Sequence, residues 1–273
     1  MSSDNRHKST KKAIRKLFFT LSLRKEKKKM RRIYIVVHSE EFPEQALGAA
    51  TQMGEQFSQE VRWLFLEETK HLALLPEYAS LPNDIANSLA TIAETNDASM
   101  FVFQIPDRIK AKQIQRLLNI TRELRVPYLF IKESQKADFS HIAVSVSFLE
   151  EDKEKATFAS AFGRFCSSRI TLITANDYGS KAQMHTNAIA TLLDKFPIVY
   201  TRTKAEKDSF GVDKEVVSKA HDEQGFSMIM LSATREYGLD DLIFGPKERG
   251  LIQQSLVPIL LINPRGDLYA LCD

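Results

Sequence analysis

Two polar stretches of the chain carry side chains that could bind an anion. Ser147 follows the apolar run at 141–146, and Ser232 ends a second apolar run that begins after Ser227. Open parallel sheets bind their ligands at the carboxyl ends of the strands, where the strand order reverses. The crevice expected at that place is lined by Ser147, Phe148, Ser232, Ala233, Thr234, Arg235 and Gly245.

Arg235 decides what chemistry this crevice would perform. Arginine suits phosphate and other anions, so Arg235 and Ser232 would together recognise such a group. In the alternative interpretation, Arg235 closes an empty pocket by pairing with a nearby carboxylate, for example Glu236 or Asp240. The sequence leaves both interpretations open.

No arrangement of residues in the sequence indicates catalysis. The six histidines are scattered without the spacing of metal ligands. A P-loop, a nucleophile elbow and a complete dinucleotide fingerprint are all missing from the sequence. His38 stands at the end of an expected strand, yet a hydrogen-bonded surface histidine is the simpler interpretation. We therefore expect a protein that is not an enzyme and has no metal site.

The composition is typical of a soluble globular protein. The 273 residues suffice for two domains, and 43% of them are hydrophobic and 27% charged. The two cysteines, Cys166 and Cys272, are too few for a disulfide framework. Cys166 lies in an apolar helical pattern that is typical of a packed thiol. We therefore expect a reducing, cytoplasmic setting.

The net charge of +3 hides an asymmetry between the start of the chain and the rest. Residues 1–32 hold thirteen Lys or Arg against Asp4 and Glu26, whereas the remaining 241 residues hold 25 basic and 33 acidic groups. The body of the protein is therefore acidic and its first segment basic. An acidic body argues against sequence-specific recognition of nucleic acid.

The basic segment, residues 1–29, contains the apolar stretch 13–23, AIRKLFFTLSL, between lysine-rich clusters. Its large apolar residues recur at helical spacing, so it could lie on an anionic membrane surface as an amphipathic helix. It is too short to span a bilayer, and it lacks the features of a secretory signal. Three interpretations stay open: a solvated flexible tail, a true start at Met30, and a membrane or polyanion anchor.

Strands and helices are expected to alternate through the first part of the chain. The run IYIVV at 33–37 is typical of a strand buried on both faces. Strands are expected at 33–37, 61–66, 100–104 and 128–131, and helices at 42–57, 83–93 and 110–124. Such alternation predicts a parallel sheet with right-handed crossovers.

The same pattern restarts after a short polar stretch at 135–139, which we take as a domain boundary. Strands are expected at 141–146, 170–175, 198–203, in the run after Ser227 and at 258–262. Helices are expected at 153–166, 181–196, 213–224 and between the last two strands. This order predicts the domains 30–135 and 140–265, flanked by tails at 1–29 and 266–273.

The two parts repeat each other. The stretch VPYLFI at 126–131 matches VPILLI at 257–262, and Ser99-Met100 matches Ser227-Met228. The spacing from the serine to the proline is 28 residues in the first part and 31 in the second. Matching flanks and strand order favour an internal duplication. The first copy is shorter by about one helix and one strand.

The turn after Ser232 resembles the phosphate-binding signature of the universal stress protein family. That signature is a glycine, two residues, a glycine, nine residues, a glycine, and then serine or threonine. The four places fall on Ser232, Arg235, Gly245 and Pro246, so only one glycine is kept. Glycines let backbone amides close around a phosphate, whereas an arginine side chain fills that space and proline has no amide donor.

The resemblance also covers the order of elements over residues 140–265, and over 31–135 it is only topological. It implies two tandem, doubly wound α/β domains of the adenine nucleotide alpha hydrolase type, the first abridged. It further implies that the two domains pack like the family's homodimer, an intramolecular pseudo-dimer. The strands at 128–131 and 258–262 would then meet and cover each other's open edge.

Members of the family that bind nucleotides hold an aspartate at the end of the first strand. Ser147 occupies this place in the second part and His38 in the first. In the first part, Gln104, Asp107 and Leu117 stand where the glycines would be. The resemblance therefore implies that ATP does not bind in the family's usual manner.

From these observations we expect a non-catalytic, tandem regulatory or binding module that needs no cofactor and acts in the stress response through an unknown protein partner. One alternative is a protein that binds ATP or another anion through residues 232–246, with slow ATPase activity. Another is a membrane-surface adaptor that uses residues 1–29. A further homodimer is also compatible with the sequence.

Overall fold

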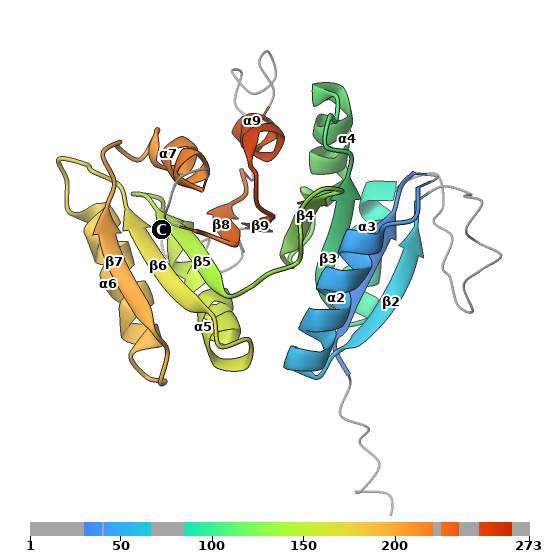
Figure 1. Cartoon of the computed structure of the whole chain (residues 1–273), viewed down its shortest axis with the longest axis horizontal. Coiled ribbons are helices and arrows are strands. Elements are labelled where there is room, and N and C mark those ends of the chain that lie inside the picture. The colour runs from blue at the N-terminus through green and yellow to red at the C-terminus, as the bar shows by residue number, and fades with distance from the viewer. Residues whose placement is uncertain (1–29, 40, 67–84, 221–224, 235–245, 264–273) are drawn as a thin grey trace, which may run out of the picture.

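Short apolar runs of the sequence form the strands of one sheet (Figure 1). The structure, a computed structural model, describes residues 30–39, 41–66, 85–220, 225–234 and 246–263. Within these residues the strands are β1 (Arg32–Val37), β2 (Glu60–Phe65), β3 (Ala98–Ile105), β4 (Tyr128–Lys132), β5 (His141–Val146), β6 (Arg169–Thr174), β7 (Tyr200–Lys204), β8 (Met228–Ser232) and β9 (Ile259–Ile262). Their order across the sheet is β2-β1-β3-β4-β9-β8-β5-β6-β7.

Burial follows the sequence of each strand. Strands β5 and β8 are buried along their whole length, and β1 is buried except at its first residue. Strands that are covered on both faces favour such apolar, β-branched runs. The edge strand β7, YTRTK, is mostly exposed. Its polar and charged side chains hinder pairing with another edge.

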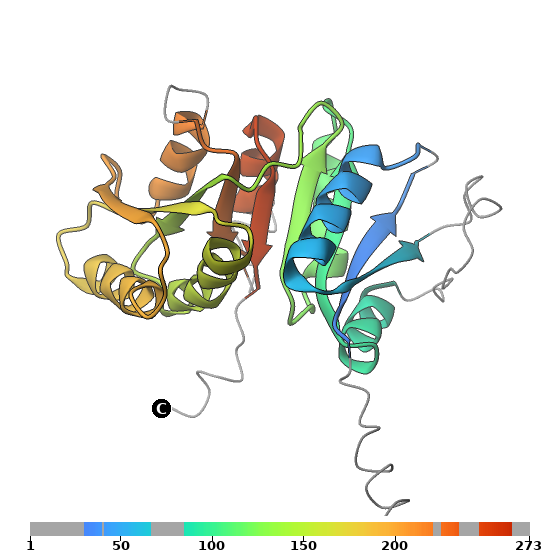
Figure 2. The ribbon, with the colours of Figure 1, turned by 60° about the horizontal axis from the view of Figure 1, so that its bottom comes forward.

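Helices cover both faces of the sheet (Figure 2). They are α2 (Glu44–Phe57), α3 (Ile85–Thr95), α4 (Ala111–Thr121), α5 (Lys155–Phe165), α6 (Lys181–Leu193), α7 (Val212–Lys219) and α9 (Lys247–Gln254), with a 3-10 helix, η2 (Glu150–Glu154), before α5. Apolar side chains of α2, of α5 and of the later part of α6 share one buried cluster with the sheet, and those of α3, α4, α7 and α9, with Ala182 of α6, share the other.

Strands β4 and β9 join the first half of the sheet (residues 32–132) to the second half (residues 141–262). They pair antiparallel, with Tyr128 opposite Leu261 and Phe130 opposite Ile259. These are the two strands that the resemblance led us to expect side by side. The other strand pairs of the described sheet are parallel. The sheet predicted to be parallel within each half is therefore confirmed, and the antiparallel pair occurs only between the halves, because two similar units that meet through the same edge run in opposite directions.

A reciprocal pair of side chains caps the helices beside this junction. Lys132 Nζ donates hydrogen bonds of 2.8 Å to the carbonyl oxygens of Gln253 and Ser255, at the end of α9 in the second half. Asn263 Nδ2 donates to Thr121 O at 2.9 Å, at the end of α4 in the first half. Lys132 and Asn263 each directly follow the repeated VP-x-L-x-I stretch. Equivalent positions of the repeat therefore perform equivalent tasks across the junction.

Ring contacts reinforce the junction on one face of the sheet. Phe57 at the end of α2 meets Phe162 of α5 edge to face, with ring centroids 5.2 Å apart. It also meets Phe165 of α5 at 6.1 Å. On the other face, Arg249 of α9 donates to Gln115 of α4 at 3.5 Å. The two halves thus contact each other through the sheet and through both helix layers.

The expected alternation of strands and helices is confirmed, with differences at the ends of elements. The helix expected at 153–166 starts with the 3-10 helix η2, and α5 ends at Phe165. Cys166 directly follows α5, half-buried against the core, and burial raises the pKa of its thiol to about 11. Among the described residues, the first half has four strands and the second half five.

Candidate functional site

The candidate site lies where β5 and β8 end, in the second half of the sheet. Strand β5 has β6 on one side and β8 on the other, so the strand order reverses at β5. Ligands of open α/β sheets bind outside the carboxyl ends of strands at such a point. The sequence placed Ser147 and Ser232 here, and the structure brings the two residues together.

Both serines donate to the carboxylate of Asp152, a residue of η2. The Ser147 N–H lies 2.5 Å and the Ser147 hydroxyl 2.7 Å from Asp152 Oδ2. The Ser232 hydroxyl lies 2.6 Å from Asp152 Oδ1. Asp152 itself is 1% exposed, so its carboxylate fills the space between the two strand ends.

Lys155, at the start of α5, completes this arrangement. Its Nζ donates to Asp152 Oδ1 at 2.7 Å and to the carbonyl oxygen of Ser145 at 2.7 Å, and the residue is 1% exposed. Burial alone would raise the pKa of Asp152, but Lys155 and the hydroxyl of Ser232 bring that pKa below its ordinary value. Asp152 and Lys155 therefore form a buried ion pair whose carboxylate accepts four hydrogen bonds.

A chain of polar contacts extends from this pair to the surface. The Ser145 hydroxyl donates to Asp213 Oδ1 of α7 at 2.7 Å. Lys247, the first residue of α9, donates to Asp213 Oδ2 at 3.1 Å. These contacts link β5, α7 and α9, so the polar groups at the ends of β5 and β8 are held from several elements.

Glu248 places a second buried carboxylate at the N-terminal turn of α9. It is 2% exposed, and its Oε1 accepts a hydrogen bond from the backbone N–H of Thr234. Its Oε2 has no hydrogen-bond partner among the residues that the structure describes. Burial raises the pKa of Glu248, while Thr234 and Lys247 oppose this shift. Backbone amides at a helix N-terminus suit an anion, and here a side-chain carboxyl group of the protein stands at that position.

The outer end of η2 is fixed by His185 of α6. His185 Nδ1 donates to the carbonyl oxygen of Ser147 at 3.0 Å, and its Nε2 lies 3.0 Å from Glu150 Oε2. Glu150 also pairs with Lys153. The short helix that carries Asp152 is therefore anchored at its exposed end as well as at its buried one.

The remaining residues predicted for this site have separate places. Phe148 donates its N–H to the Ser209 hydroxyl at 2.9 Å, and its ring meets that of Phe210 at 5.5 Å. Ala233 is buried and donates its N–H to Ile262 O. Arg235 and Gly245, together with the proposed Arg235 partners Glu236 and Asp240, lie outside the described residues.

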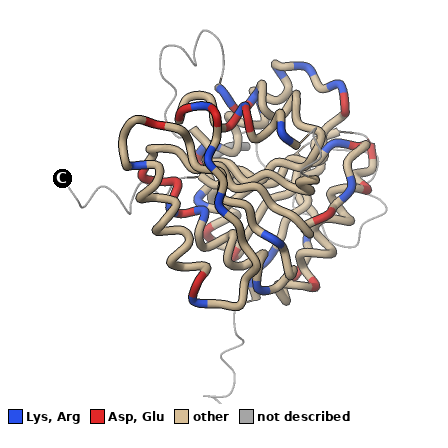
Figure 3. The backbone as a smooth tube through the Cα atoms, turned by 60° about the vertical axis from the view of Figure 1, so that its left-hand side comes forward, with Lys and Arg blue, Asp and Glu red and all other residues tan. Residues whose placement is uncertain are grey.

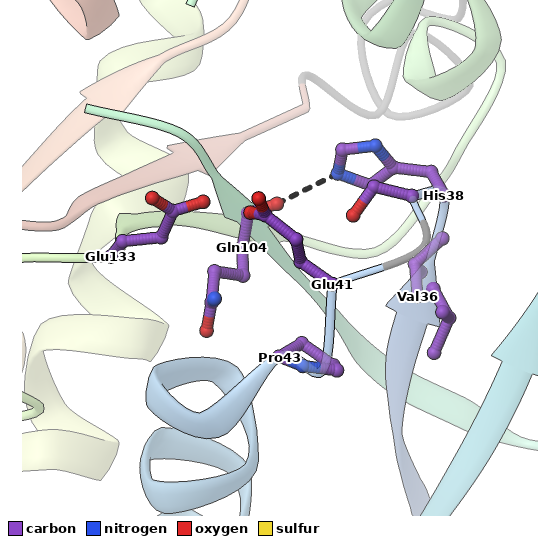
Figure 4. A pocket seen from close by; sticks show the side chains of 8 residues that line it. Val36, His38, Glu41, Pro43, Gln104 and Glu133 are labelled. Carbon is purple, nitrogen blue, oxygen red and sulfur yellow. Dashed lines mark hydrogen bonds between the residues drawn. The ribbon is translucent and has the colours of Figure 1, made fainter. Parts of the chain in front are cut away.

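The first half has a pocket at the equivalent place, the first-half crevice, which lies at the ends of β1 and β3 (Figure 4). His38 Nε2 donates to the carbonyl oxygen of Gln104 at 2.7 Å. This contact agrees with the interpretation of His38 from the sequence as a hydrogen-bonded histidine. The side chain of Gln104 points to α2, where its Oε1 accepts from the N–H groups of Gln45 at 2.8 Å and Ala46 at 3.3 Å. Gln104 thus caps α2 instead of leaving the helix N-terminus open to an anion.

Two carboxyl groups, those of Glu41 and Glu133, line the first-half crevice (Figure 4). Burial, together with the hydrogen bond to Glu41 and its charge, raises the pKa of Glu133 to about 6. Asp107 lies nearby and adds to this shift, while its own carboxylate accepts from the Ser134 hydroxyl at 2.7 Å. The first-half crevice is therefore a site of like charges. Within the described ranges, no group of three metal-ligating side chains is placed to hold a metal ion.

Sequence reasoning missed the residues that fill the second-half site. Asp152 and Lys155 belong to the run EEDKEK at 150–155, which is typical of a solvated surface. Glu248 similarly stands in the polar stretch PKERG. The one signal that could have indicated a pair is the spacing of Asp152 and Lys155, because residues three apart lie on the same face of a helix.

Comparison with known proteins gives the fold but no family. No protein-family model matches the chain, and no curated protein matches it. A solved structure of a functionally unknown protein from Pseudomonas aeruginosa PAO1 is 13% identical, with a TM-score of 0.62 over 88% of this chain and 95% of that one. A putative universal stress protein from Pseudomonas aeruginosa UCBPP-PA14 is 12% identical, with the same TM-score and coverage.

A universal stress protein from Archaeoglobus fulgidus DSM 4304 is also similar. It is 11% identical, with a TM-score of 0.62 over 86% of this chain and 97% of that one. The chain therefore shares the mostly parallel α/β fold of universal stress protein-like structures. At this level of identity the likeness concerns the fold alone.

Proposed function

We propose that the chain is a universal stress protein-like regulatory module that binds a protein partner, without catalysis and without ATP. Its two halves are related copies that pack like the family's homodimer, and its phosphate-binding motif has lost most of its chemistry. The observation that carries the proposal is the Asp152 carboxylate, buried between the ends of β5 and β8 and bound by four donors.

A nucleotide would have to displace this carboxylate before it could use the crevice. Breaking a buried ion pair by removing one partner costs about 3–5 kcal/mol, because the other charge is left uncompensated. Glu248 adds to the cost of placing a nucleotide here, since it already accepts the Thr234 N–H and stands at the N-terminus of α9. Phosphate groups would meet carboxylates at both positions.

The first-half crevice opposes phosphates in a different way. Glu41 and Glu133 repel each other there, and a phosphate would add further negative charge. The N-terminus of α2 is already satisfied by Gln104. Among the described residues, side chains of Gln104 and Glu248 thus occupy the two helix N-termini that would otherwise favour a phosphate.

The charge distribution supports a protein partner over a nucleic acid. Figure 3 shows Lys and Arg positions together with Asp and Glu positions on the described elements in view. Recognition of nucleic acid relies on a basic stripe or patch. In the part of the chain that the structure describes, no helix combines the length and apolar character needed to cross a membrane.

Calorimetric titration of the full chain with ATP and with ADP, each with Mg²⁺, tests the proposal. We expect no saturable heat at millimolar nucleotide, and no rise in melting temperature. The control is the Arg235→Ala variant, which removes the cation that replaces the second glycine of the motif. Saturable binding by the natural chain that this variant loses would contradict the proposal and would identify an altered anion site at residues 232–246.

A further inference from the structure

We infer that the donors at the ends of β5 and β8 form a built carboxylate-binding site that the chain occupies with its own Asp152 side chain. The inference rests on the proposed function, because it concerns the same crevice, and it adds the class of ligand. That class is a small monocarboxylate, which Asp152 replaces from within.

The donors around Asp152 come from the frame of the fold. Ser147 follows β5, Ser232 ends β8 and Lys155 begins α5, whereas Asp152 alone belongs to η2. Two donors reach each carboxylate oxygen: the N–H and hydroxyl of Ser147 reach Oδ2, and Ser232 and Lys155 reach Oδ1. This is the complete set of contacts that a planar carboxylate favours.

The donors are also held in place by contacts that do not involve Asp152. Lys155 Nζ donates to the carbonyl oxygen of Ser145 at 2.7 Å. The Ser147 hydroxyl accepts from the N–H of Leu149 at 3.2 Å. Ser232 is fixed within β8, which pairs with β9. Removal of the Asp152 carboxylate would therefore leave a cradle of donors already oriented toward one point.

Charge and size select the ligand. The cradle offers the positive charge of Lys155 in direct contact, which balances a monoanion. Asp152→Gly removes a CH₂–COO⁻ group, whose volume acetate restores, and Asp152→Ala removes only COO⁻, whose volume formate restores. A larger phosphate dianion would bring more charge and oxygen atoms than these donors satisfy.

The experiment compares three full-length variants: Asp152→Gly, Asp152→Ala and the matched control Asp152→Asn. The asparagine variant keeps the shape of the side chain and continues to fill the cradle. Melting temperature is measured against increasing sodium acetate, sodium formate and sodium chloride at constant ionic strength. Where a variant is unfolded in chloride, the readout is recovery of its far-ultraviolet circular dichroism spectrum on addition of the carboxylate.

We expect acetate to raise the melting temperature of Asp152→Gly by roughly 5 °C or more at saturation. Formate should do the same for Asp152→Ala, and neither anion should act on Asp152→Asn or on the natural chain. Adding Ser232→Ala to Asp152→Gly should weaken acetate binding by about tenfold, the effect of one charge-assisted hydrogen bond.

Equal responses of all variants, or no response of Asp152→Gly and Asp152→Ala, would overturn the inference and leave Asp152 as an ordinary buried partner of Lys155. This outcome is distinguishable from failure of the proposed function. Nucleotide binding by the natural chain would refute the proposed function, whatever acetate does to the variants. Absence of rescue would refute only the carboxylate site.

Discussion

The two halves use the same place in the fold in opposite ways. In the second half, the place where β5 and β8 end is filled by Asp152 and Lys155, two charges that compensate each other out of contact with water. In the first half, the corresponding crevice is lined by Glu41 and Glu133, two groups of like charge. The second-half site is thus filled by two opposite charges, whereas the first-half crevice is lined by two acidic groups.

This difference teaches that two halves with similar strand order need not share the same chemistry. The strands that end at these two places, β1 and β5, are buried and apolar in a similar way, so burial constrains their residues in both halves. The residues just beyond the strand ends have no such constraint. His38 and Ser147 stand at equivalent ends, yet one contacts a backbone carbonyl and the other an ion pair.

The largest expected effect comes from breaking the charge match of the second half. Lys155→Met should lower the free energy of unfolding by about 3–5 kcal/mol, because it leaves the Asp152 carboxylate buried without its cation. Urea denaturation measures the loss. The double variant Asp152→Asn, Lys155→Met removes both charges and should regain much of the stability. Equal stability of the single and double variants would show that the pair is not coupled.

A smaller effect is expected in the first half, where Gln104 caps α2. Gln104→Ala removes the acceptor for the N–H groups of Gln45 and Ala46 and should cost about 1 kcal/mol. The matched control is Gln183→Ala on the exposed surface of α6, which should change stability by less than about 0.5 kcal/mol. If both variants unfold at the same urea concentration, the cap contributes nothing.

The smallest effects should have opposite signs in the two crevices. The pKa of Glu133 is raised to about 6 in the folded protein. Its protonated form therefore contributes favourably to the free energy of unfolding at low pH, and this contribution is lost as the pH rises through about 6. Glu133→Gln should therefore stabilise the protein slightly at pH 7–8 and leave it unchanged below about pH 4. Thermal melts across this pH range measure the difference.

Glu150 is the counterpart for this comparison. Lys153 lowers the pKa of Glu150, against the opposing effect of burial, and His185 adds to the lowering. Its favourable contribution is present above its unfolded pKa and is lost as the pH falls through the folded one. Glu150→Gln should therefore destabilise the protein slightly at pH 7. If Glu133→Gln and Glu150→Gln changed the stability at pH 7 in the same direction, the proposed electrostatic contrast between the two halves would be contradicted.

The sequence predicted most of the strands and the meeting of Ser147 with Ser232. Runs such as IYIVV and HIAVSV identify buried strands wherever they pack, and strand order then places their ends together. The position of Asp152 could not be predicted in the same way. A charged run such as EEDKEK is usually exposed, and its burial here depends on the turn of η2 and on donors from strands far along the chain.

The junction between the halves shows both sides of this limit. The repeated VP-x-L-x-I stretch indicated which strands would meet, and β4 and β9 do pair. The tasks of Lys132 and Asn263 were hidden, because two different residues at equivalent positions cap the partner half's helix through different atoms. Patterns of apolar residues predict packing, whereas polar contacts depend on the final placement of single atoms.

The measurement that tests the contrast most directly is a carbon-detected NMR titration of the side-chain carboxyl groups in the full chain, from pH 8 to pH 3. Glu133 should titrate near pH 6. Asp152 should stay ionised below its ordinary pKa of about 3.9, because Lys155 and its hydrogen-bond donors stabilise the charged form. An Asp152 carboxyl that titrates above about pH 4, or a Glu133 carboxyl with an ordinary pKa, would contradict the account of one filled and one mismatched crevice.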